Sequence, residues 1–188
     1  MSEKFSVECS SPIAHIEIQN YLLKELKPII ITNRPIIFIC IGTDRSTGDS
    51  LGPLVGYKLK FLSKKNIHIY GTLEEPIHAK NLADTLNSIL DRYTNPYIIA
   101  IDSSLGNLNN VGKIFIEKKP LAPGIALNKK LPLVGELSIT GIVNISTGFE
   151  FLVLQNTRLF TVMTLADVIS KGIYNFSLKC TNTSSFIN

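Results

Sequence analysis

The sequence contains no tryptophan, few aromatic residues and no dense run of one charge. Aromatic residues make up 8% and charged residues 18% of the 188 residues, and the formal net charge is +4 at pH 7. Proteins that bind single-stranded nucleic acid stack bases on aromatic rings, and DNA-binding modules present a dense cationic patch. Because the sequence has neither feature, we expect no nucleic-acid partner.

Cysteines are also few, and long hydrophobic runs are missing. The cysteines are Cys9, Cys40 and Cys180, and such an odd, scattered set is a poor disulfide framework. The most apolar run, at residues 36–41, is far too short to cross a bilayer. Residues 1–11 lack the apolar segment of a secretory signal. We therefore expect a cytoplasmic protein with no membrane partner.

The sequence does contain short apolar runs that alternate with amphipathic segments. Strands are predicted at residues 36–41, 66–70 and 97–101, and helices at residues 51–62 and 79–92. This order is typical of βαβ units and a parallel sheet with helices on both faces. We predict an α/β fold: a three-layer α/β/α sandwich with a mostly parallel sheet. Residues 1–188 are expected to form a single domain, with residues 1–12 as a flexible tail.

The flanking segments are less regular. A weak helical pattern over residues 13–27 is expected to end at Pro28, because proline interrupts helices. Further strands are predicted at residues 113–117 and 138–145, and a terminal helix at residues 157–173. The proline-rich segment 118–132 is too long for a simple connection, so we expect it to cover a site.

Ionisable side chains follow each of the first strands. Asp49 lies at a helix start after the first strand, Glu74, Glu75 and His78 follow the second, and Asp102 follows the third. Ligands of parallel sheets bind beyond the carboxyl ends of the strands, so we expect these groups at one rim. Two carboxylates held close together have pKa values that are pushed apart. Asp49 and Asp102 therefore form a candidate acid/base pair for hydrolysis.

The same residues also have structural interpretations. Asp49 is a suitable helix cap, and Asp102 can bond the backbone of the turn at residues 103–104. The loop at residues 42–48 precedes a helix, as a phosphate-binding loop does, but matches neither common phosphate motif. His78 lacks the close partners of a metal ligand. We expect no cofactor.

Several long motifs within residues 36–173 carry a resemblance to a known family. They are G-T-D-R-S-T-G-D-S-L-G-P at residues 42–53, G-T-L-E-E-P-I-H-A at 71–79, L-P-L-V-G at 131–135, S-I-T-G-I-V-N at 138–144 and V-L-Q-N-T-R-L at 153–159. These motifs resemble the sporulation protein family YyaC. That family is in turn similar to the germination protease of spores and to hydrogenase-maturation endopeptidases, which implies a phosphorylase/hydrolase-like fold.

The resemblance also implies an activity. The germination protease has essential aspartates in its P-D-A-L-G-P and A-I-D-A motifs, and the matching residues of this sequence are Asp49 and Asp102. Residues 123–131, which include Asn128, also resemble its P-G-x-x-x-x-N-K stretch. The resemblance thus implies a sporulation-associated endopeptidase that hydrolyses a spore protein, such as a small acid-soluble spore protein, inside the sporulating cell or spore.

The sequence departs from the peptidase pattern at one turn. The peptidases carry G-x-G-N at the first strand exit, where this sequence has I-G-T-D at residues 41–44. Three interpretations therefore stay open: a peptidase, a non-catalytic protein that binds a peptide or partner in the same groove, and a site for a divalent cation held by Asp49, Asp102 and His78. The apolar region at residues 138–154 is a candidate homo-oligomer face. The residues expected to bind substrate are Gly42, Thr43, Asp44, Glu75, His78 and Asn128.

Overall fold

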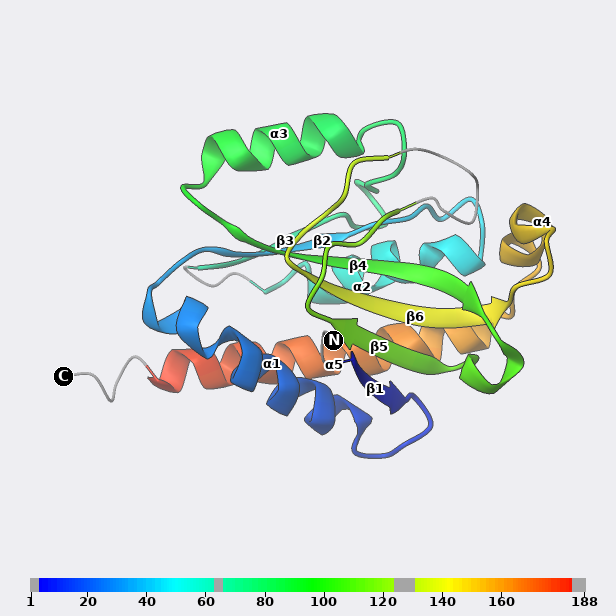
Figure 1. Cartoon of the computed structure of the whole chain (residues 1–188), viewed down its shortest axis with the longest axis horizontal. Helices are drawn as coiled ribbons and strands as arrows, with labels where there is room; N and C mark the ends of the chain where they lie inside the picture. The colour runs from blue at the N-terminus through cyan, green and yellow to red at the C-terminus, as the bar shows by residue number, and fades with distance from the viewer. Residues whose placement is uncertain (1–3, 63–65, 124–130, 184–188) are drawn as a thin grey trace.

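The computed structural model describes residues 4–62, 66–123 and 131–183, which form a mixed α/β fold (Figure 1). In this part of the chain six strands form one sheet in the order β1-β5-β6-β4-β2-β3. The strands are β1 (Lys4–Glu8), β2 (Ile36–Cys40), β3 (Ile67–Tyr70), β4 (Tyr97–Gly106), β5 (Lys113–Glu117) and β6 (Leu137–Ile145).

The sheet is mostly parallel, as predicted. Strand β2 pairs in parallel with both β3 and β4, and β4 pairs in parallel with β6. Strands β5 and β1 extend the sheet beyond β6 with antiparallel pairing. The predicted βαβ order therefore accounts for the parallel strands β3, β2 and β4, whereas the parallel position of β6 was not predicted and the antiparallel strands form one edge.

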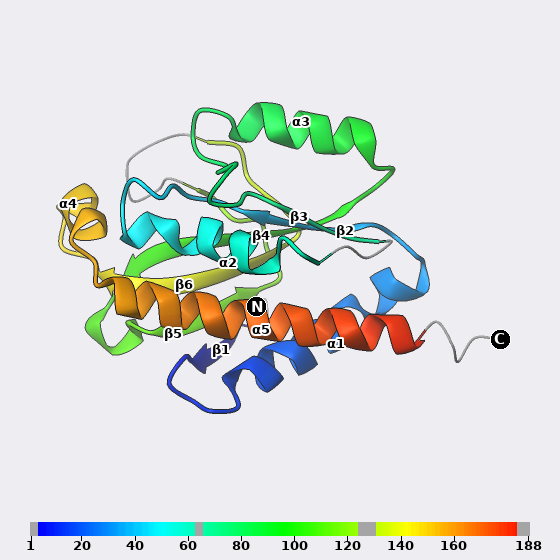
Figure 2. The ribbon, with the colours of Figure 1, turned by 180° about the vertical axis from the view of Figure 1, so that it is seen from behind.

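Helices cover both faces of the sheet, which confirms the predicted three-layer sandwich (Figures 1 and 2). Helices α1 (Ala14–Ile31), α2 (Leu51–Leu59) and α5 (Leu159–Thr183) pack on one face, and α3 (Leu82–Arg92) packs on the other. The short helix α4 (Glu150–Gln155) and the 3₁₀ turns η1 (Gly48–Ser50) and η2 (Leu108–Asn110) complete the described elements.

The central strands are apolar throughout because both of their faces are covered. In β2, Phe38 and Cys40 belong to the core under α1, α2 and α5, whereas Ile37 and Ile39 belong to the core under α3. All residues of β2 are buried. This two-sided burial explains why a short apolar run predicted the strand correctly.

Strands β5 and β6 have a different pattern, because α3 does not cover them (Figure 1). In β5, Ile114 and Ile116 are fully buried, whereas Lys113, Phe115 and Glu117 are half-buried. Successive side chains of a strand point to opposite faces. The face of the sheet that carries α3 is therefore open along β5 and β6.

The first residues differ from the prediction of a flexible tail at residues 1–12. Lys4–Glu8 form strand β1, whose residues pair with Lys113–Glu117. The ring of Phe5 stacks on that of Tyr21 at 4.6 Å between centroids, and Val7 is buried in the core. The sequence analysis missed this strand because its partner lies far away in the sequence.

Helix α1 does not end at Pro28, which corrects a second prediction. It continues to Ile31, and Ile29 and Ile30 pack against the core. The Thr32 hydroxyl donates to the carbonyls of Pro28 and Ile29 at 3.0 and 3.1 Å. These bonds and the apolar packing stabilise the last turn. The helix therefore tolerates the loss of the hydrogen bond that the missing N–H of Pro28 would have made.

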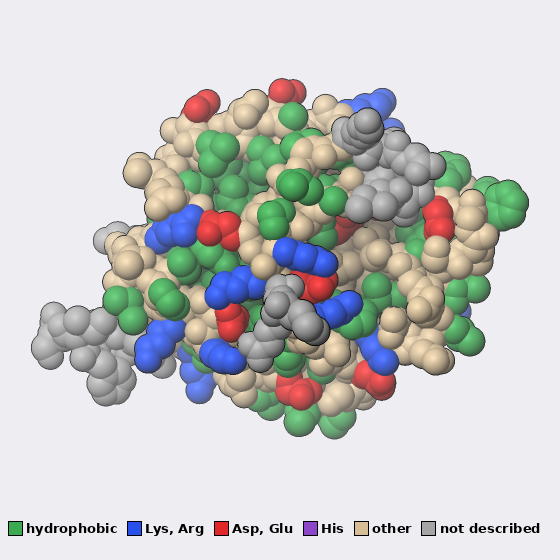
Figure 3. Space-filling view, viewed as in Figure 1, with side chains coloured by type: hydrophobic (Ala, Val, Ile, Leu, Met, Phe, Trp, Pro, Cys, Tyr) green, Lys and Arg blue, Asp and Glu red, His purple; other side chains and the backbone are tan. Residues whose placement is uncertain are grey.

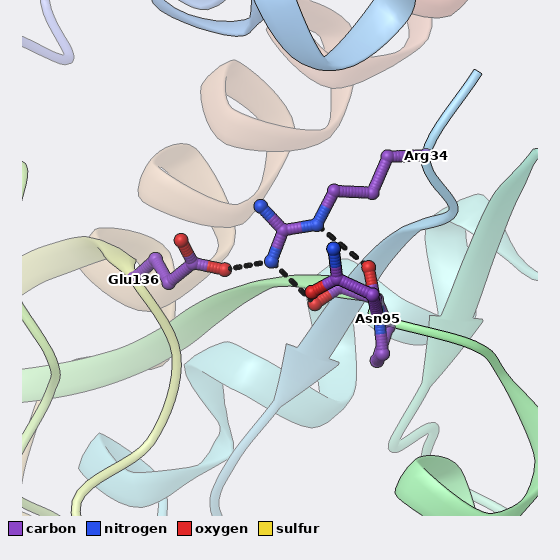
Figure 4. A network of polar contacts seen from close by, with 4 residues as sticks. Arg34, Asn95 and Glu136 are labelled. Atoms are coloured by element: carbon purple, nitrogen blue, oxygen red, sulfur yellow. Dashed lines mark hydrogen bonds and ion pairs between the residues drawn. The ribbon is translucent and has the colours of Figure 1, made fainter. Parts of the chain in front are cut away.

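Arg34 joins the segments that precede three strands of the sheet (Figure 4). Its guanidinium donates to the carbonyls of Asn95 and Pro96 at 2.6 and 3.0 Å and to the Glu136 carboxylate at 2.5 Å. Arg34 lies before β2, Asn95 before β4 and Glu136 before β6. The bonds therefore fix the amino ends of these neighbouring strands together.

No helix in residues 4–62, 66–123 or 131–183 is both long enough and apolar enough to span a membrane.

The contact between α2 and β2 predicts a large effect of replacing Gly52. A Cβ atom at this position would lie 2.1 Å from the carbonyl oxygen of Ile41, so Gly52→Ala forces the helix away from the strand. We expect the free energy of unfolding in urea to fall by about 1–3 kcal/mol. Ser88→Ala, at an exposed position of α3, is the control and should change it by less than about 0.5 kcal/mol. Equal stability of the two variants would contradict the close contact.

Candidate active site

The open face of the sheet forms a cavity of about 1270 Å³. Its floor includes Asp102 and Ser104 of β4, Ser138 and Thr140 of β6, and Phe115 of β5. Charged side chains gather near the middle of this face, and hydrophobic side chains protrude at the end where α4 lies (Figures 1 and 3). The lining of the cavity therefore combines polar, charged and apolar side chains.

Asp102 lies in the interior of β4, not at its end as predicted. Strand β4 continues to Gly106 because its pairing with β6 also continues, with an irregularity between Ser104 and Leu105. Ile99 and Ile101 point into the core under α2 and α5. Since side chains alternate along a strand, Asp102 faces the cavity, where it lies opposite Thr140.

Asp49 reaches the same cavity from a different element. It belongs to η1, the turn between β2 and α2, and is half-buried. The turn is closed by two backbone bonds, from the Asp49 amide to the Ser46 carbonyl and from the Thr43 amide to the Asp49 carbonyl, both at 3.0 Å. Ser50, and not Asp49, occupies the N-cap position of α2.

The surroundings of Asp102 strongly favour its protonated form. Asp102 is 9% exposed, and burial raises the pKa of its carboxyl group well above the usual range. The negative charge of Asp49 raises the pKa of Asp102 further, while the Ser103 amide, which donates to Asp102 Oδ1 at 2.7 Å, opposes the shift. A proton donor and a charged carboxylate thus face one cavity, and such a pair can supply general acid and general base catalysis.

The bond from the Ser103 amide gives Asp102 a structural role as well, although residues 103–104 lie within β4 and do not form the expected turn. This bond involves one carboxyl oxygen, and Asp102 also lines the cavity. A hydrogen bond to the neighbouring backbone orients the carboxyl group, so the structural role is compatible with a chemical one.

The turn at Gly42, Thr43 and Asp44 lies beside Asp49 but does not line the cavity. Gly42 has φ of +141°, and a Cβ atom there would lie 2.0 Å from the Asp49 carbonyl oxygen. Its amide donates to the Ile77 carbonyl at 2.8 Å. Thr43 is half-buried and Asp44 is exposed. Glycine at position 42 therefore allows the backbone of this turn to lie close to the Asp49 carbonyl.

Glu75 and His78 are also outside the lining of this cavity. Glu75 is exposed, and the His78 amide donates to the Asn81 side chain at 2.8 Å, which closes the turn before α3. Asn128 lies outside the described residues, so its substrate-binding role stays a prediction, as do those of the other residues expected to bind substrate.

A metal centre formed by Asp49, Asp102 and His78 is not seen. His78 does not line the cavity that holds the two aspartates. In the segments that the structure describes, no group of three His, Cys, Asp or Glu side chains is arranged to hold a metal ion.

The sequence analysis identified the two aspartates but missed the other groups around them. Ser138 and Thr140 alternate in β6 with the buried Leu137 and Ile139. This alternation indicates a strand with one polar face. Only the pairing of β6 with β4 shows that this face adjoins Asp102.

Two comparisons with known proteins give consistent results. Residues 6–172 match the family described as "Protein of unknown function (DUF1256)". The chain is also 49% identical over 157 residues to the "Uncharacterized protein YyaC" of Bacillus subtilis (strain 168). The aligned residues make up 84% of this chain and 76% of that relative. The match to the family includes β2, η1 and β4, which carry the aspartates.

The burial of Asp102 predicts a pH-dependent effect of replacing it with asparagine. Because its pKa is raised in the folded state, the wild type loses stability as the pH rises from about 4, the usual carboxyl value, through the raised pKa. Asp102→Asn removes this ionisation. Its free energy of unfolding in urea, relative to wild type, should increase between pH 5 and pH 8, by about 1.4 kcal/mol for each pH unit over which the wild-type carboxyl group is protonated in the folded state and ionised in the unfolded state.

Asp91→Asn is the matched control for this experiment, because Asp91 is exposed on α3. We expect its stability relative to wild type to be the same at pH 5 and pH 8. A difference between Asp102→Asn and wild type that does not change with pH would mean that the carboxyl group is not desolvated.

Proposed function

The chain belongs to the DUF1256 family, and we propose that it is a peptidase in which Asp49 and Asp102 act together on a water molecule. The observation that carries this proposal is the shared cavity: two carboxyl groups from separate elements line it, and one of them is buried with a raised pKa. Hydrolytic acid/base pairs have this property, because one group must hold a proton while the other accepts one.

In the proposed reaction, the ionised Asp49 accepts a proton from water as the water oxygen attacks the carbonyl carbon of the peptide bond. The C–N bond then breaks, and the protonated Asp102 donates its proton to the leaving amine nitrogen. The products are a carboxylic acid and an amine. Transfer of the proton from Asp49 to Asp102 through solvent restores the starting state.

The size of the cavity favours a polypeptide substrate over a small molecule. Sites for small molecules enclose about 300–1000 Å³, whereas this cavity is about 1270 Å³. Its floor runs along three adjacent strands and carries the hydroxyl groups of Ser104, Ser138 and Thr140. An extended polypeptide has the length and the polar backbone to occupy such a surface.

The resemblance of the YyaC family to the germination protease supports the same activity, because its essential aspartates match Asp49 and Asp102. On that basis we propose that the substrate is a spore protein, such as a small acid-soluble spore protein, and that the enzyme acts in the cytoplasm of the sporulating cell or in the spore.

One observation favours the second candidate function, a non-catalytic protein that binds a peptide in the same cavity. The amides of Gly42 and Thr43 donate to the carbonyls of Ile77 and Asp49 at 2.8 and 3.0 Å. Neither amide is therefore available at this turn to stabilise the oxyanion that forms during peptide hydrolysis. Binding of a small acid-soluble spore protein without any cleavage, at several pH values, would favour this second function.

Replacing either aspartate is expected to abolish cleavage. Asp49→Asn removes the base and Asp102→Asn removes the acid, so each should lower kcat/KM by about 100- to 10,000-fold. Cleavage of purified small acid-soluble spore proteins, followed by mass spectrometry of the products, measures this loss. Asp91→Asn, which changes an exposed carboxylate outside the cavity, should cleave at the wild-type rate. Undiminished cleavage by both aspartate variants would overturn the proposed pair.

The rate of cleavage is also expected to depend on pH in a defined direction. The acid must be protonated, so kcat should fall as the pH rises through the raised pKa of Asp102. Rates measured from pH 4 to pH 10 on the same substrate would reveal this alkaline limb. A rate that keeps increasing with pH would contradict the assignment of Asp102 as the acid.

A further inference from the structure

Three large apolar side chains are exposed at one end of the cavity. Phe149, Phe151 and Leu152 are 72%, 57% and 55% exposed, and all three line the cavity. We refer to these three residues as the α4 lip, because they lie in α4 or immediately before it. Clustered exposed apolar side chains mark sites of interaction, and this cluster adjoins the candidate acid and base.

The α4 lip is held in a fixed position beside Asp49. Leu154 of α4 is only 5% exposed, and a Cβ atom added at Gly48 would lie 2.8 Å from Leu154 Cδ2. The helix therefore packs directly on the residue that precedes Asp49. A larger residue at position 48 would therefore push α4 away from the turn that carries Asp49.

The turn before α4 is also ordered by polar bonds. Glu150 Oε1 accepts hydrogen bonds from the Ser146 hydroxyl at 2.6 Å and from the Gly148 amide at 3.3 Å. The Asn144 side chain donates to the Thr157 hydroxyl at 3.2 Å, which joins the end of β6 to the segment after α4. A binding surface that is ordered before the ligand arrives loses less entropy on binding.

Asp102 lies between the two ends of the cavity, and the large exposed apolar side chains of the lining gather at one of them. Along the sheet, Asp102 is level with Thr140 and Phe115. Toward the amino end of β4 the lining continues with Ser138, Glu117 and Lys4. Toward the carboxyl end of β4 lie Ile142 and the α4 lip, together with the polar side chains of Asn107, Ser146 and Glu150.

We propose that the α4 lip is a specificity site that binds a large apolar side chain of the polypeptide substrate: leucine, isoleucine, phenylalanine or methionine. An extended chain that crosses Asp49 and Asp102 along the cavity has one flank over Ser138 and Glu117 and the other on the lip. The apolar residue is therefore required on one side of the cleaved bond, at a fixed position. The cleavage part of this inference rests on the proposed function, whereas binding of the apolar side chain does not.

The test uses a mixture of synthetic decapeptides of random sequence as the probe. In the first arm, immobilised Asp102→Asn protein captures peptides from the mixture, and the bound fraction is sequenced by mass spectrometry. In the second arm, wild-type protein cleaves the mixture, and the residues around each cleaved bond are counted. Both arms are repeated with the three lip residues changed to serine: Phe149→Ser, Phe151→Ser and Leu152→Ser.

The control protein carries Phe61→Ser and Leu90→Ser. These side chains are 66% and 56% exposed and do not line the cavity, so the control removes exposed apolar surface away from the lip. Exposed substitutions rarely alter stability, and thermal unfolding of both variants verifies that they are folded.

We expect large apolar residues to be enriched at least about tenfold in the captured peptides and at one position beside the cleaved bond, as hydrophobic pockets discriminate to this degree. The lip variant should lose the enrichment and raise KM with little change in kcat, and the control should keep the wild-type preference. The inference is overturned if captured peptides show no apolar preference, or if the lip variant keeps it. Apolar capture without cleavage would instead overturn the proposed function alone, and cleavage without apolar preference would overturn the inference alone.

Discussion

The parallel pairing of β4 with β6 beyond Asp102 is the constraint on which the candidate site depends. This register places Asp102 level with Thr140 and directs it away from the core under α2 and α5. Because side chains alternate, a shift of β4 by one residue would turn the carboxyl group into that core and turn Ile99 and Ile101 out of it. The same pairing keeps Asp102 well within the sheet, where burial favours the protonated acid.

The cavity exists because the two faces of the sheet are covered unequally. Helices α1, α2 and α5 cover one face broadly, while α3 covers the strands β2, β3 and the start of β4 on the other. The antiparallel strands β5 and β1 extend the sheet past α3. Their open face carries polar and charged side chains, so the uncovered surface is compatible with water and with a polar substrate backbone.

The parts of the fold that local sequence determines were predicted well. The runs that became β2 and β4 are apolar because both faces are buried, and a short apolar run between turn residues is a strong strand signal. Strand β1, the last turn of α1 and the extension of β4 past Asp102 depend on partners distant in the sequence. The two aspartates could be predicted because each follows a predicted strand. The hydroxyl groups and the α4 lip beside them could be recognised only once the position of β6 in the sheet was known.

Strand β1 has a practical consequence for handling the protein. Lys4 forms part of the cavity wall, with its ammonium group 4.1 Å from the centre of the Phe115 ring. A label attached to the Lys4 amine would therefore lie at the cavity and compete with any peptide added in an assay. The carboxyl end of α5 lies at the end of the molecule opposite α4 (Figure 1), so a label on that part of the helix stays away from the cavity.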